Sequence, residues 1–94
     1  MEINSNELIK LNNMIIIDLR EEKEFQKRHL QNAINLDFHK LIIEPEKYLL
    51  KNKKYLLVCD LGLMSKKTSE ILNKQGYLTY SLNGGMKCLF KRLK

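Results

Sequence analysis

Two short runs of consecutive apolar residues constrain the fold of this chain more than any other feature. One is Met14-Ile15-Ile16-Ile17, which leads into Asp18 and Leu19, and the other is Tyr55-Leu56-Leu57-Val58-Cys59. A strand with one solvated face alternates apolar and polar residues, whereas a continuous apolar run is typical of a strand buried on both faces. We therefore predict two central strands in a sheet that carries helices on both sides.

Helix-like segments alternate with these strands. Ser5 can cap a short helix that carries Leu8, Ile9 and Leu11. Residues 21–29 begin with acids and end with bases, as the dipole of a short helix prefers. The segment 38–50 contains Pro45, so we expect two short helices there. With further strands expected at 32–36 and 77–82, the pattern predicts an α/β fold with a central, mostly parallel sheet flanked by helices on both faces.

Apolar stripes mark the last two helices. Ser65 is the expected N-cap of a helix that stops at Gly76, and a second helix is expected over 86–93. The residues expected to pack the first of these helices on the sheet are Met64, Thr68, Ile71 and Leu72. Those expected to form the core side of the second are Met86, Leu89, Phe90 and Leu93.

Length and composition limit the class of protein. The 94 residues suit a single domain, 1–94, and the hydrophobic fraction of 44% is typical of a globular chain. Membrane helices need roughly 18 consecutive apolar residues, which this sequence lacks, and its start does not resemble a signal peptide. We expect a cytoplasmic protein without a membrane partner, whose two cysteines are free thiols.

The net charge of +6 first suggests a nucleic-acid partner. The basic residues are scattered, however, and most are lysines rather than the arginines that favour phosphate forks. They are not interleaved with aromatic residues that could stack on bases. We therefore expect no nucleic-acid partner and assign the charge to solubility and a mild attraction for anions. The sequence leaves the oligomeric state open.

Cys59 is the strongest candidate for a reactive residue. It ends a predicted central strand and is followed by a loop with Gly62 and by the start of a helix. In an open parallel sheet the ligand crevice lies beyond the carboxyl ends of the strands. Backbone N–H groups and the positive end of a helix would then favour a thiolate over a thiol. The alternative is that Cys59 is a small buried hydrophobic residue, and the local pattern leaves both open.

Three segments in order resemble the rhodanese-like domain family, over a span from about Ile3 to Phe90. Residues 18–25 with 29–36 are similar to the family pattern D-(V/L)-R-x-x-x-E-(F/Y) followed by H-I-x-G-A-x-N-(I/L). Residues 58–65, VCDLGLMS, occupy the place of the active-site loop, often Y-C-R-S-G-N-R-S. Residues 81–86, SLNGGM, are similar to the closing L-x-G-G-(I/M).

The resemblance implies a sulfurtransferase or persulfide carrier. In catalytic members the loop cysteine, here Cys59, takes sulfane sulfur from thiosulfate or a protein persulfide and passes it to a thiol acceptor. No metal or other cofactor is implied, and the expected partner is a small sulfur donor or a partner protein persulfide. The expected substrate-binding loop consists of Asp60, Leu61, Gly62, Leu63, Met64 and Ser65.

Two loop positions depart from the family pattern. Many active members carry arginine at the second and sixth loop positions, where this chain has Asp60 and Met64. A carboxylate beside the thiol opposes an anionic donor, so we expect a partner persulfide to be a better donor than free thiosulfate. The alternative function is a catalytically weak rhodanese-like binding or regulatory module. Some cysteine phosphatases share this fold, but that function is excluded because it needs an arginine at the end of the loop, where this chain has Met64 and Ser65.

The remaining polar candidates have structural interpretations. Asp18, Arg20 and Glu24 are expected to brace the loop, as in the family, with Arg20 and Glu24 as an i, i+4 pair. His29 and His39 lack a partner at metal-ligand spacing, so we expect a satisfied structural histidine and a surface histidine.

Cys88 is the second thiol of the chain. It lies beside the apolar stripe of the last helix, so we expect a packing residue. A role in resolving a Cys59 intermediate would require the two sulfurs to lie close together.

Overall fold

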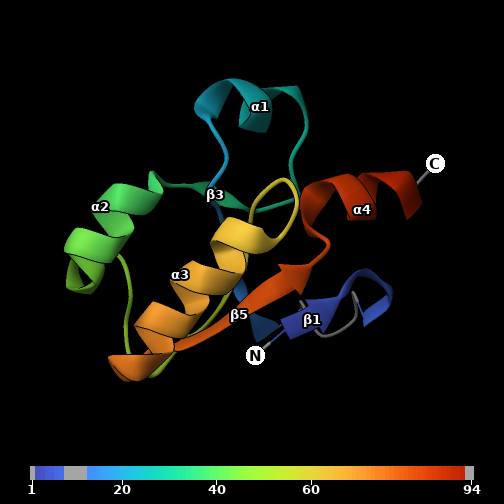
Figure 1. Ribbon diagram of the computed structural model, residues 1–94. Helices are drawn as coiled ribbons and strands as arrows, with labels where there is room; N and C mark the ends of the chain where they lie inside the picture. The colour runs from blue at the N-terminus through green and yellow to red at the C-terminus, as the bar shows by residue number, and fades with distance from the viewer. Residues whose placement is uncertain (1, 8–12, 93–94) are drawn as a thin grey trace.

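The computed structural model describes residues 2–7 and 13–92, and its centre is a parallel sheet of five strands in the order β1-β5-β4-β2-β3 (Figure 1). Each pair of neighbouring strands is parallel. The predicted α/β fold is therefore confirmed. The strands are β1 (Glu2–Asn4), β2 (Ile15–Asp18), β3 (Ile34–Asn35), β4 (Lys54–Val58) and β5 (Leu78–Asn83).

The helices connect these strands as the sequence pattern predicts. The segment around Pro45 forms two short helices, because proline begins a new helical turn and cannot continue the previous one. No helix in the described ranges is long and apolar enough to cross a membrane. The helices are α1 (Glu22–Lys27), α2 (Phe38–Ile43), η2 (Pro45–Lys47), α3 (Leu63–Lys74) and α4 (Gly85–Arg92).

Strand β4 is buried on both faces, as its continuous apolar run predicts. Tyr55 and Leu57 pack into the core that α2 and α3 cover, whereas Leu56 and Val58 pack into the core that α4 covers. Leu56, Leu57 and Val58 are all fully buried. The sheet thus separates two apolar layers, and the carboxyl end of β4 emerges between them.

The first strand is absent from the sequence-based prediction. β1 is an edge strand that pairs with β5, and Ile3 is its one buried residue. Three residues with a single apolar position carry too little pattern to indicate a strand. Residues 5–7 form a single 3-10 turn where the first helix is expected to begin, and Leu8, Ile9 and Leu11 lie outside the described residues.

Helix α3 differs from its prediction in both start and orientation. Its N-cap is Gly62, not Ser65, so the helix begins at Leu63. Its buried side consists of Ser65, Thr68, Ser69 and Leu72. Met64 and Ile71, which were expected on the sheet, are 41% and 40% exposed.

Polar contacts with β5 explain this orientation of α3. The hydroxyl of Ser69 lies 2.9 Å from that of Thr79, and the Thr79 N–H donates to the Asn73 side chain at 2.9 Å. Small polar side chains let the helix approach the strand closely and satisfy each other's hydrogen bonds there.

The expected apolar stripe of α4 is confirmed for Met86 and Leu89, which are fully buried. Phe90 is partly buried, and Leu93 lies outside the described residues.

Asp37 caps helix α2. Its Oδ1 accepts hydrogen bonds from the N–H groups of His39 at 2.8 Å and Lys40 at 3.3 Å. These bonds, the Lys40 bond above all, hold the pKa of the Asp37 carboxyl below its ordinary value of 3.8. A carboxyl with a lowered folded-state pKa adds stability above its unfolded-state pKa and loses it as the pH falls through the folded-state pKa.

Asp37→Ala is therefore expected to lower the melting temperature by a few degrees at pH 7. The difference from the wild type should shrink as the pH falls below the unfolded-state pKa of about 4 and through the lower folded-state pKa, where the folded wild-type carboxyl takes up its proton. Thermal unfolding followed by circular dichroism at pH 7 and pH 3 measures both values. Asp37→Asn keeps an accepting oxygen and is the control. A loss that is equal at both pH values would contradict a charged cap.

Candidate active site

A cavity of about 500 Å³ opens at the carboxyl ends of β2 and β4. The chain continues from β2 to β3 on one side of the sheet and from β4 to β5 on the other, so β2 and β4 flank the point where the strand order reverses. Ligands of open parallel sheets bind at such points. The cavity is lined by Leu19, Arg20, Glu21, Glu24, Cys59, Asp60, Leu61, Leu63 and Met64.

The Cys59 sulfur lies at the base of the loop between β4 and α3. The N–H groups of Gly62 and Ser65 donate to Sγ at 3.2 Å and 3.3 Å, and the Ser65 hydroxyl lies 3.3 Å from the same sulfur. Cys59 is 6% exposed. Backbone donors aimed at one sulfur stabilise negative charge on it, which a nucleophilic thiolate requires.

The six predicted loop residues divide into two groups. Gly62 and Ser65 are buried and contact the sulfur. The side chains of the other four are exposed around the cavity mouth: Asp60, Leu61, Leu63 and Met64. The structure therefore separates backbone groups that contact the sulfur from side chains that are exposed at the cavity mouth.

The start of α4 holds this loop in place. The N–H of Met86 donates to the Cys59 carbonyl at 2.8 Å, and the N–H of Lys87 donates to the Asp60 carbonyl at 3.0 Å. Gly85 has a φ of +67°, and a Cβ there would lie 2.6 Å from the Cys59 carbonyl oxygen and still closer to the Asp60 carbonyl. The sequence analysis assigned residues 81–86 only by their resemblance to a family motif and missed this role, although two consecutive glycines before a helix are a signal of close backbone contact.

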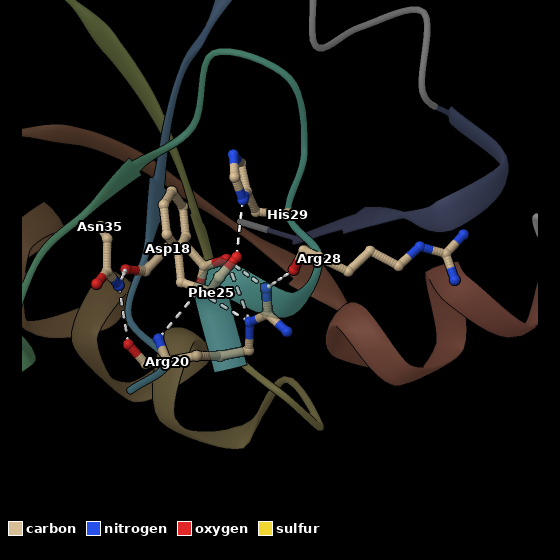
Figure 2. A network of polar contacts seen from close by, with 6 residues as sticks. All are labelled: Asp18, Arg20, Phe25, Arg28, His29 and Asn35. Atoms are coloured by element: carbon tan, nitrogen blue, oxygen red, sulfur yellow. Dashed lines mark hydrogen bonds and ion pairs between the residues drawn. The ribbon is translucent and has the colours of Figure 1, made fainter. Parts of the chain in front are cut away.

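Asp18 forms a buried ion pair with Arg20, one of the residues that line the cavity (Figure 2). The Arg20 side chain donates to the Asp18 carboxylate from Nε and Nη2, the latter at 2.9 Å, and Nη2 also donates to the Arg28 carbonyl at 2.6 Å. The Asn35 side-chain amide donates to the carbonyls of Asp18 and Arg20, both at 2.9 Å. These bonds brace the segment that follows β2 and forms one wall of the cavity.

The predicted i, i+4 pair of Arg20 and Glu24 is wrong. Arg20 precedes α1, so it is not on a helical turn with Glu24, and its charge is paired with Asp18. The Glu24 carboxylate lies 3.5 Å from Lys27 Nζ instead.

Both histidines occupy positions outside the cavity. The His29 ring stacks on Phe25 at 3.9 Å, and its Nδ1 lies 2.7 Å from the Phe25 carbonyl, so it is a satisfied structural histidine (Figure 2). His39 is an exposed residue with Nδ1 3.6 Å from Asp37. Over the described ranges, His, Cys, Asp and Glu side chains do not form a cluster that could hold a metal ion.

Cys88 is exposed on α4 rather than packed as predicted. Its Sγ lies 3.7 Å from the Ser5 hydroxyl, and it lines a separate hollow with Asn4 and Asn83. Cys88 does not line the cavity that Cys59 occupies.

Comparison with known proteins places this chain in a family. The family model that describes the rhodanese-like domain matches residues 5–89 of this chain. The chain belongs to the rhodanese-like domain family. The thiosulfate sulfurtransferase GlpE of Coxiella burnetii is 35% identical over 80 residues, which are 84% of this chain and 74% of that protein. A tRNA uridine(34) hydroxylase of Aster yellows witches'-broom phytoplasma is 32% identical over 79 residues, 78% of this chain but 26% of that protein.

A solved structure has the same fold. The rhodanese-related protein of Thermoplasma volcanium superposes with a TM-score of 0.87 at 27% sequence identity, covering 97% of this chain and 91% of that one.

Proposed function

We propose that this protein is a sulfurtransferase that carries sulfane sulfur as a persulfide on Cys59. The observation that carries the proposal is the Cys59 sulfur, which accepts two backbone N–H groups at the carboxyl end of β4 and borders an open cavity. Membership of the rhodanese-like family and similarity to a protein named thiosulfate sulfurtransferase support a rhodanese-type sulfurtransferase.

The reaction proceeds in two displacements. The Cys59 thiolate attacks the outer sulfur of a donor, the donor S–S bond breaks, and the donor leaves as sulfite from thiosulfate or as a thiolate from a protein persulfide. An acceptor thiolate then attacks the terminal sulfur of the Cys59 persulfide, and Cys59 leaves as a thiolate. The N–H groups of Gly62 and Ser65 stabilise the negative charge on Cys59 at the start and the end of this cycle.

Intact-mass analysis after exposure to thiosulfate or to a persulfidated peptide tests this mechanism. The wild type is expected to gain one sulfur atom, which a reductant removes. Cys59→Ser should abolish the gain, whereas Cys88→Ser should retain it, because Cys88 lies in a separate hollow. A sulfur that remains in Cys59→Ser and is lost in Cys88→Ser would contradict the proposal.

A binding or regulatory module is the second candidate function. The observation that favours it is the exposed Asp60 at the cavity mouth, where many active family members carry arginine. If Cys59 gains no sulfur from any donor while the protein remains folded, this function replaces sulfur transfer.

A further inference from the structure

The charge at the cavity mouth is opposite to that of the whole chain. The net charge is +6, yet three carboxylates line the cavity, those of Glu21, Glu24 and Asp60. Among the described residues, Glu21 and Asp60 have no side-chain ion pair or hydrogen bond, and Glu24 pairs with the exposed Lys27. We call these three carboxylates the acidic lip.

The one cation among the described lining residues does not neutralise the lip. Arg20 is bound to Asp18, and its side chain is 4% exposed. An incoming anion therefore meets the unpaired carboxylates of Glu21 and Asp60 in front of Cys59, whereas a cation is attracted. This arrangement favours a sulfur donor or acceptor that carries positive charge close to its reacting sulfur.

An apolar groove continues from the same cavity between α2 and α3, which lie side by side in Figure 1. Its volume is about 360 Å³, and Leu63 and Met64 line both hollows. Leu63 is 71% exposed, and Met64 and Ile71 are turned to solvent because α3 presents small polar residues to the sheet. The groove is lined by Phe38, Ile42, Leu63, Met64, Lys67, Thr68 and Ile71.

We propose that the sulfur-exchange partner of Cys59 is a protein segment whose cysteine has a basic residue next to it and an apolar side chain further along. The basic residue pairs with the acidic lip, and the apolar side chain enters the groove between α2 and α3. Charge complementarity at the lip and the continuity of the groove with the Cys59 cavity carry this proposal, which rests on the proposed function.

Charged disulfides test the acidic lip without requiring sulfur transfer. In a Cys88→Ser background, the Cys59 thiolate attacks cystamine (a dication) or 3,3′-dithiodipropionate (a dianion), forming a mixed disulfide and releasing one thiolate that takes a proton. Rates are measured by intact mass and divided by the rates of the same disulfides with 2-mercaptoethanol. We expect the corrected rate to favour the dication by roughly tenfold at low ionic strength, and the ratio to fall as salt is added.

Neutralising the lip should remove this preference. Asp60→Asn with Glu21→Gln is expected to lower the cation-to-anion ratio by about threefold to tenfold. Glu70→Gln, which removes an exposed carboxylate of α3 outside the cavity, should leave the ratio unchanged. A wild-type ratio near one, or an equal change in the Glu70→Gln control, would overturn the role of the lip.

Persulfidated peptides test the groove and the charge together. Two peptides carry the same leucine and differ in lysine or glutamate beside the persulfidated cysteine, and a third replaces the leucine of the lysine peptide with serine. The lysine–leucine peptide should transfer sulfur to Cys59 at least about fivefold faster than either of the others. Ile71→Ser in the groove should lower the rate advantage of the lysine–leucine peptide. Ile43→Ser, the same substitution at an exposed α2 position outside the groove, should not lower it.

The outcomes separate this inference from the proposed function. Equal transfer from all three peptides would overturn the proposed partner and leave the sulfurtransferase intact. Absence of transfer from every peptide, combined with normal disulfide exchange at Cys59, would overturn the sulfurtransferase and with it the proposed sulfur partner.

Discussion

Gly85→Ala is expected to destabilise the protein by about 3 kcal/mol or more and to lower the rate of sulfur uptake by Cys59. The backbone at Gly85 has a φ of +67°, which an alanine adopts only with strain. The new methyl group would also overlap the Cys59 and Asp60 carbonyls, which are backbone atoms fixed by hydrogen bonds to α4. Relief of the overlap has to move the loop away from α4, and the two donors on the Cys59 sulfur move with the loop.

Urea unfolding and sulfur uptake by intact mass measure the two effects of Gly85→Ala. Gly76→Ala is the matched control, because Gly76 also has a positive φ, of +95°, but its new methyl group would meet the flexible end of Lys51 at 3.6 Å. That control should cost only the backbone strain, about 1 kcal/mol, and should leave uptake unchanged. An equal loss of stability in both variants would show that the contact of α4 with the loop is unimportant.

Arg20→Met is expected to lower the free energy of unfolding by about 3 to 5 kcal/mol. The Asp18 side chain is fully buried and would lose its charged partner, while the Arg28 carbonyl would lose the donor 2.6 Å away. Urea unfolding at pH 7 measures the loss. Lys27→Met removes one partner of an exposed ion pair, with side chains 66% and 47% exposed, and should change stability by less than about 1 kcal/mol.

A double variant distinguishes the unpaired charge from lost packing. Asp18→Asn combined with Arg20→Met removes both charges at nearly constant volume, so it should recover part of the loss caused by Arg20→Met alone. If the double variant is less stable by the sum of the two single effects, the ion pair is not the cause. Because the pair braces one cavity wall, Arg20→Met should also slow sulfur uptake under conditions where the variant is folded.

The apolar patterns of the sequence predicted most of the elements that form the sheet and its cover. The runs ending at Asp18 and Cys59 became the two central strands, since a strand buried on both faces has apolar side chains at every position. Pro45 separated two short helices as expected. Strand β1 was missed because its place in the sheet comes from pairing with β5, more than seventy residues further along the chain.

The orientation of α3 shows where a local pattern misleads. Met64 and Ile71 have the spacing of core residues, and hydrophobicity alone assigns them to the sheet. The helix instead turns Ser69 toward Thr79 on β5, whose buried hydroxyl needs a hydrogen-bond partner, and Ser65 toward the Cys59 sulfur. That choice depends on which strand lies beneath the helix, and it leaves an apolar groove beside the cavity.

The apolar pattern of the sequence was enough to predict the α/β architecture and the position of Cys59 at the end of a central strand followed by a loop and a helix. These features depend on residues that are neighbours in the chain, and local periodicity and order along the chain express them. Which charges meet could be seen only in the folded structure. It paired Arg20 with Asp18 instead of Glu24, placed the carboxylates of Glu21 and Asp60 at one cavity, and brought α4 onto the loop through Gly85. The carboxylate cluster and the Gly85 contact join segments from different strand ends, and Arg20 pairs with Asp18 because α1 begins only at Glu22. The energies of these contacts depend on distance and burial that arise only when the strands align.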